Sequence, residues 1–82
     1  MEIKYIRHEE QGFILWPAVE GDPVWHKHMG NFVTGKCSGG KILSAGFVKF
    51  INGKPECYGE SMSLNLSKHP DDNEALAQQL GI

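Results

Sequence analysis

Apolar and polar residues alternate most regularly over residues 41–66, which we predict to form one long β-hairpin. Asn52 and Gly53 lie between two β-rich runs. A type I′ turn needs a positive φ at both of its central residues, and the Asn-Gly dipeptide is preferred there for that reason. A two-residue turn sets the register and pairs Ile51 with Lys54, Lys49 with Glu56, Phe47 with Tyr58, Ala45 with Glu60, and Leu43 with Met62. A four-residue loop over 52–55 would lose the aromatic pair and the charged pair, so the shorter turn fits the pattern better.

One face of this hairpin is apolar, and a carboxylate falls within it. The face carries Leu43, Ala45, Phe47, Tyr58, Met62 and Leu64. Glu60 lies between Tyr58 and Met62, and a carboxylate on an apolar face must be paired, hydrogen-bonded, shifted in pKa or placed at the rim of the core. Glu60 and the neighbouring Tyr58 are therefore candidate ligand-binding residues. A structural partner for Glu60, such as a lysine, an arginine or a helix N-terminus, is the alternative that we favour.

The other face of the hairpin carries Ile42, Val48 and Phe50 near its ends and small residues between them. If helices cover only the first face, these three side chains form an exposed apolar patch, which usually marks an interaction surface. They are candidate partner-binding residues, for a protein partner or for a second copy in a homodimer. A loop such as 17–22 that folds over the patch is the alternative.

The rest of the chain supplies two more strands and two helices. Residues 2–7 and 12–16 have strand patterns, and Pro70 opens a helix that ends near Gly81. Asp22 and Pro23 open the other helix, which places four residues on one apolar face: Trp25, His28, Met29 and Phe32. A short strand over 24–28 is the less favoured alternative. The order ββαββα predicts a single α+β domain over residues 1–82, a four-stranded antiparallel sheet with both helices packed on one face.

Composition narrows the classes of function. The 82 residues are 40% hydrophobic and 22% charged, as in an ordinary globular domain. The formal net charge of −2 removes the electrostatic reason to expect sequence-independent binding to nucleic acid or anionic lipid. A local basic patch of Lys27, Lys36 and Lys41 with the glycine-rich loop 35–41 is the alternative by which the chain would bind nucleic acid. We find no apolar window of membrane-spanning length and no signal peptide, so we expect a cytoplasmic protein. Cys37 and Cys57 are then expected to be free thiols.

Two short runs of residues match known functional motifs in part, but the structural context of each run does not fit the motif. Gly35, Gly40 and Lys41 fit a phosphate-binding loop, yet Ile42 replaces the Ser or Thr that would hold Mg²⁺, and a strand follows instead of a helix. The run Gly59-Glu60-Ser61-Met62-Ser63 resembles a nucleophile elbow that lacks its last glycine and lies inside a predicted strand. Neither motif predicts an activity.

The chain has four histidines and two cysteines, which are residue types that bind metal ions, but their spacing is not that of a metal site. The closest pair is His26 and His28, which point about 200° apart on a helix and could share an ion only on a strand. Nothing in the sequence places a histidine beside Cys37 as the base of a nucleophilic pair. We therefore predict no metal site and no cofactor.

The segment CYGESMSLNLSKHPDD, residues 57–72, resembles the C-terminal part of small uncharacterised bacterial proteins, some of them from prophage-like regions. The resemblance implies a short cytoplasmic protein of bacterial or phage origin, and it carries no catalytic role to any residue. We expect a non-enzymatic protein-interaction module, which could self-associate through the sheet face. The alternative is a small ligand- or metal-binding enzyme that uses Glu60 together with histidine and cysteine residues.

Overall fold

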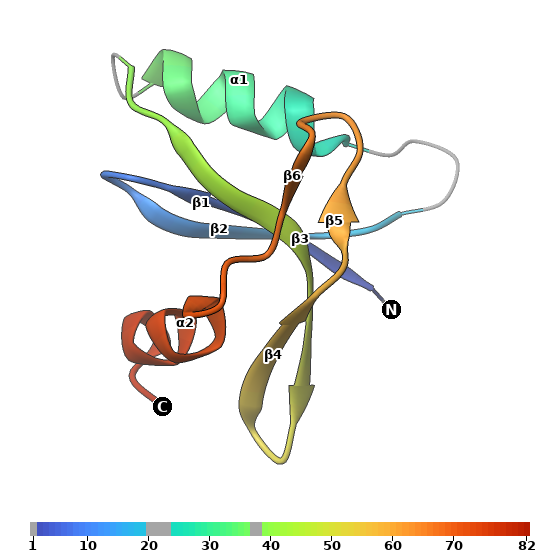
Figure 1. Ribbon diagram of the computed structural model, residues 1–82, viewed down its shortest axis with the longest axis vertical. Coiled ribbons are helices and arrows are strands. Elements are labelled where there is room, and N and C mark those ends of the chain that lie inside the picture. Colours follow the sequence, from blue (N-terminus) through green and yellow to red (C-terminus); the bar gives the residue numbers. More distant parts are fainter. Residues whose placement is uncertain (1, 20–23, 37–38) are drawn as a thin grey trace.

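A four-stranded antiparallel sheet forms the centre of the molecule, in the order β2-β1-β3-β4 (Figure 1). The computed structural model describes residues 2–19, 24–36 and 39–82. The strands and helices are β1 (Ile3–His8), β2 (Gly12–Pro17), α1 (His26–Lys36), β3 (Ile42–Ile51), β4 (Lys54–Tyr58), β5 (Glu60–Ser61), β6 (Leu66–Ser67) and α2 (Asp72–Leu80). The predicted α+β class and four-stranded sheet are confirmed, and the two-stranded ribbon β5–β6 is an addition to the prediction.

Two hydrophobic clusters lie on opposite faces of this sheet. One contains Tyr5 and Val48 beneath Leu76 of α2, and the other contains Ile6 and Ala45 beneath Val33 of α1. Neighbouring strand residues point to opposite faces, so Tyr5 and Ile6, both fully buried, show that both faces are covered. Figure 1 shows the strands passing between the two helices. The expectation that both helices share one face is therefore corrected: α2 covers one face of the sheet and α1 covers the other.

The hairpin of β3 and β4 has the predicted turn and the predicted register near its tip. Asn52 and Gly53 have φ values of 52° and 79°, as a type I′ turn requires. The observed pairs include Ile51 with Lys54, Lys49 with Glu56, and Phe47 with Tyr58. The predicted pairs of Ala45 with Glu60 and Leu43 with Met62 are wrong. The chain leaves the hairpin at Gly59, whose φ of 74° turns it toward the separate ribbon.

Helix α1 presents a different face to the sheet from the one predicted. His26, Gly30 and Val33 are buried, whereas Trp25 and Phe32 are 53% and 61% exposed. Gly30 faces Ile42 of β3, where an added Cβ would lie at an ordinary van der Waals distance of 3.5 Å from Cγ1. The helix also excludes the alternative strand over 24–28. The predicted start at Asp22 and Pro23 lies outside the described residues, and α1 continues to Lys36, into the segment predicted as a glycine-rich loop.

Helix α2 crosses the sheet and reaches both of its edge strands. Asn73 accepts the backbone N–H of Cys57 on β4 through Oδ1 at 2.6 Å. Near the other end of the helix, Gln79 accepts the N–H of Phe13 on β2 at 2.8 Å and donates to the carbonyl of Phe13 at 3.0 Å. Unpaired backbone groups on edge strands are a route to aggregation, and α2 occupies backbone groups of one residue on each edge strand. Pro55, which has no backbone N–H to donate, lies in the edge strand β4 and is buried.

No helix within the described part of the chain is both long enough and apolar enough to cross a membrane.

Candidate functional site

A hollow of about 620 Å³ lies where the start of α1 meets β3 and the β5–β6 ribbon. Its apolar lining comes from Trp25, Phe47 and Met62, and its charged lining from Lys4 and Glu60. Hollows of roughly 300–1,000 Å³ with mostly apolar walls are typical of binding sites. Met62 is 90% exposed and Trp25 is 53% exposed, so two large apolar side chains border the hollow in contact with water.

Serine hydroxyls fix the turn that carries Met62. Ser61 is 2% exposed, and its Oγ accepts the N–H of Leu64 at 3.2 Å and lies 3.2 Å from Oγ of Ser63. Ser63 accepts the N–H of Lys27 at 3.1 Å, so it caps the first turn of α1 from another part of the chain. The serines that resemble a nucleophile elbow therefore hold a turn against a helix.

His26 stands in the wall of the hollow as a buried, neutral ring. Its Nε2 lies 2.7 Å from the carbonyl of Gly46, which can only accept, so Nε2 carries the proton. The rings of Trp16 and Phe47 meet it edge-on at centroid distances of 5.4 and 5.5 Å. Burial lowers the pKa of His26 below its ordinary value, and the charge of Lys4 lowers it further, while the bond to Gly46 opposes the shift.

Opposite charges line the same hollow. The Nζ atom of Lys4 donates to the carbonyl of Val24 at 3.1 Å, which ties β1 to the chain just before α1. Glu60 is exposed, because β5 leaves the hairpin before this residue can enter the apolar face. Of the positions left open for Glu60, the structure shows an exposed one, at the lining of the hollow. Tyr58 stands behind it and stacks on Phe47 at 5.7 Å between ring centroids.

The structure does not bring Ile42, Val48 and Phe50 together as a surface patch. Val48 is 1% exposed and belongs to the cluster beneath α2. Ile42 packs on the opposite face, against the cluster beneath α1. Phe50 is 44% exposed near the hairpin tip. The two helices cover the faces on which such a patch would have formed.

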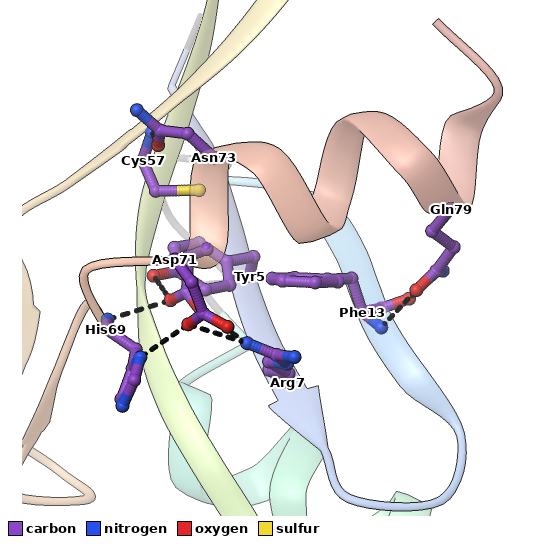
Figure 2. Close-up of polar contacts among 9 residues, drawn as sticks. Tyr5, Arg7, Phe13, Cys57, His69, Asp71, Asn73 and Gln79 are labelled. Carbon is purple, nitrogen blue, oxygen red and sulfur yellow. Dashed lines mark hydrogen bonds and ion pairs between the residues drawn. The ribbon is translucent and has the colours of Figure 1, made fainter.

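A second polar cluster joins β1 to the start of α2 (Figure 2). The carboxylate of Asp72 is fully buried and accepts the Tyr5 hydroxyl at 2.6 Å, an N–H of Arg7 at 3.1 Å and the backbone N–H of His69 at 2.9 Å. Arg7 also contacts Asp71 at 3.1 Å, and His69 hydrogen-bonds to the same Asp71 oxygen. Burial and the bond to Asp72 raise the pKa of Tyr5.

The geometry of this cluster resembles a metal site only in part. Ligand atoms of His69, Asp71 and Asp72 lie within 4.8 Å of one another. The guanidinium of Arg7 already contacts one oxygen of each of the two carboxylates, and an ion would have to displace it. The arrangement can hold a helix on a sheet. The sequence places the acidic residues in the first helical turn, but it does not reveal that Tyr5 and Arg7 meet them.

The remaining histidine and cysteine candidates are kept apart. His28 is exposed and stacks on Trp25 at 5.5 Å between ring centroids, whereas His26 points into the core, as a helix requires. Cys57 is a free, buried thiol, and burial together with the charge of Asp72 raises its pKa to about 11. Cys37 lies outside the described residues. No pair of a nucleophile and a base is present among these described side chains.

Comparison of the chain with protein-family models, with curated proteins and with solved structures finds no match in any of the three. The resemblance of residues 57–72 to bacterial and prophage proteins thus stays a prediction.

Proposed function

We propose that this domain is a protein-interaction module. Its contact surface, here called the α1 surface, consists of Trp25, Phe32, Phe47 and Met62 with the hollows between them. The observation that carries the proposal is the exposure of Met62 and Trp25, at 90% and 53%, beside an apolar hollow. Large exposed apolar groups that gather around a concave site are typical of surfaces that a partner covers.

A second hollow extends the α1 surface along the helix. It has a volume of about 330 Å³ and is lined by Val24, His28, Met29 and Phe32. Phe32 is 61% exposed, one of the highest values among the large apolar residues of the described chain. Trp25, which lines the first hollow, stacks on His28, which lines the second, so the two hollows adjoin at this pair. Two adjoining hollows can receive two apolar side chains of a partner.

The chemistry of the α1 surface favours a protein over other ligands. Tryptophan, phenylalanine and methionine are enriched where proteins meet, and aromatic anchors supply much of the binding energy there. A formal net charge of −2 gives no general attraction for nucleic acid. An enzyme that used Glu60 with histidine or cysteine would need an available ring nitrogen or thiol beside it. His26 lines the same hollow as Glu60, but its Nε2 is bound to the carbonyl of Gly46, and Cys57 lies in the cluster beneath α2.

Selection from a peptide library tests this proposal. Peptides displayed on phage should be selected against the domain and counter-selected against its Met62→Glu variant. We expect apolar peptides whose binding weakens at least ~10-fold in the variant and whose NMR shifts centre on the α1 surface. The matched control is Phe50→Glu, since Phe50 is 44% exposed far along β3. A library that yields no such peptides, or only peptides that bind elsewhere, would contradict the proposal.

A further inference from the structure

We infer that the partner is a second copy of this chain, and that a two-fold axis places Met62 of each copy in the hollow of the other, between Trp25 and Phe47. The inference rests on the proposed function and names its partner. The two aromatic rings and the thioether suit each other chemically, because methionine sulfur makes favourable contacts with aromatic rings.

The positions of Met62 and of the hollow allow two copies of the chain to form a closed pair. Met62 is 90% exposed at the start of the turn between β5 and β6, and the same residue borders the hollow. A projection that lies beside its own cavity can pair with an identical surface across a two-fold axis, so that each copy fills the other. A projection far from the cavity would instead favour open chains of molecules.

The turn is held in place before any partner arrives. Ser61 and Ser63 bind it to itself and to α1 through the bonds to Leu64 and Lys27, at 3.2 and 3.1 Å. Trp25 is stacked on His28, and Phe47 lies between Tyr58 and His26. Association therefore orders few new groups, which favours affinity because the entropic cost of binding is smaller.

The charges of the hollow are self-complementary. Lys4 and Glu60 line the same hollow, so a two-fold axis can place Lys4 of each copy opposite Glu60 of the other. A partner with a large charge of one sign would meet repulsion from one of these residues. Two copies of a chain with a net charge of −2 repel each other only weakly.

The area that a stable interface must bury means that the contact extends beyond the hollow. A stable interface buries about 800 Å² on each partner. That is a substantial part of the 5271 Å² surface of this molecule. The contact must then continue along α1, where the second hollow and Phe32 continue the same apolar surface. We accordingly expect a weak dimer whose formation depends on concentration.

Sedimentation over a range of concentrations tests the dimer. Between about 10 µM and about 1 mM, the weight-average mass should rise toward that of two chains, and Met62→Glu should raise the dissociation constant at least ~10-fold. Phe50→Glu should leave the constant unchanged, since Phe50 lies outside the α1 surface. The Met62 methyl NMR signal should move upfield as dimer forms, because it enters between two aromatic rings.

A charge exchange provides the sharper test. Lys4→Glu and Glu60→Lys should each weaken self-association, because each creates two like-charge contacts in the dimer. An equal mixture of the two variants should restore it, since both contacts are then attractive. If Lys4 paired with Glu60 within one chain instead, mixing the two variants would not restore self-association.

The outcomes separate this inference from the proposed function. A protein that stays monomeric over the whole range, a dimer indifferent to Met62→Glu, or variants that mixing does not rescue would each overturn the inference. If such a protein still binds selected peptides at the α1 surface, the proposed function stands and the partner is another protein. A dimer broken by Met62→Glu and rescued by mixing supports both.

Discussion

The buried polar side chains of this fold differ in whether they have a hydrogen-bond partner. Ser44 and Asp72 are both fully buried on the α2 side of the sheet. Asp72 accepts three hydrogen bonds, whereas Oγ of Ser44 has no partner among the described residues. A buried hydroxyl without a partner loses its hydration and gains nothing in return. Ser44 is therefore a residue at which the fold can be improved.

We predict that Ser44→Ala raises the free energy of unfolding by about 1 kcal/mol, because it removes the unpaired hydroxyl and leaves a small cavity at most. Urea denaturation measures the change. Ser61→Ala is the matched control, and it should lower stability because Ser61 binds Leu64 and Ser63. A Ser44→Ala protein that is less stable than wild type would show that this hydroxyl has a partner.

The buried imidazole of His26 predicts a loss of stability in mild acid. Burial lowers its folded pKa, so the unfolded chain, with the ordinary value near 6.5, binds a proton more readily. The contribution of neutral His26 is complete well above pH 6.5 and declines as the pH falls below 6.5. Denaturation curves between about pH 7.5 and about pH 5.5 should show this decline, and the His26→Asn protein should show less of it. An NMR titration midpoint above 6.5 for His26 would contradict the prediction.

At the scale of single residues, the sequence predicts only part of the candidate site. Glu60 stands out in the sequence because the predicted register places it on the apolar face of a long hairpin, whereas the structure leaves it exposed at the hollow. The spacing of Trp25 and Phe32 predicts one apolar helical face. Periodicity shows that such a stripe exists but not whether a sheet lies against it, and the stripe that is buried in α1 is another one, of His26, Gly30 and Val33. Which stripe is buried depends on how α1 packs against β1 and β3, and the helix sequence alone does not encode this packing.

Among the elements, α2 is attached to β1 by charge as well as by its apolar side. We predict that Asp72→Asn lowers the free energy of unfolding by about 3 kcal/mol, because it removes the buried negative charge beside Arg7 and replaces one of the two accepting oxygens with a donor. Asp71→Asn should cost much less, since the side chain of Asp71 is 55% exposed. Thermal or urea denaturation of both variants measures the difference. Equal losses would mean that burial does not strengthen the Asp72 contacts.

The elements that local chemistry determines were predictable, and those that depend on distant contacts were not. Asn52 and Gly53 set the hairpin register because a type I′ turn needs their conformations. Gly59 ends that hairpin, but a single glycine in a strand pattern does not distinguish a bulge from an exit. The opposite placement of the helices depends on how the chain crosses the sheet, which no local pattern encodes.

For the whole molecule, we predict that the edge of β2 relies on Gln79. In Gln79→Ala, the amide of Phe13 should exchange with deuterium at least ~10-fold faster, because the side chain that accepts its N–H is gone. Gln78→Ala is the matched control, since Gln78 is exposed on the same helix. Mass spectrometry or NMR of the exchange measures the effect. An unchanged rate would mean that Phe13 is protected by another group.

The attachment of α2 to both sheet edges has a consequence for handling and redesign of the chain. Because one nine-residue helix covers the backbone of Phe13 at one edge and of Cys57 at the other, its release would uncover both edges in a single event. Shortening the chain before residue 79 would leave the edge of β2 open to strand exchange with neighbours. An extension after the exposed Ile82 leaves these bonds intact, so tags and fusion partners belong at that end.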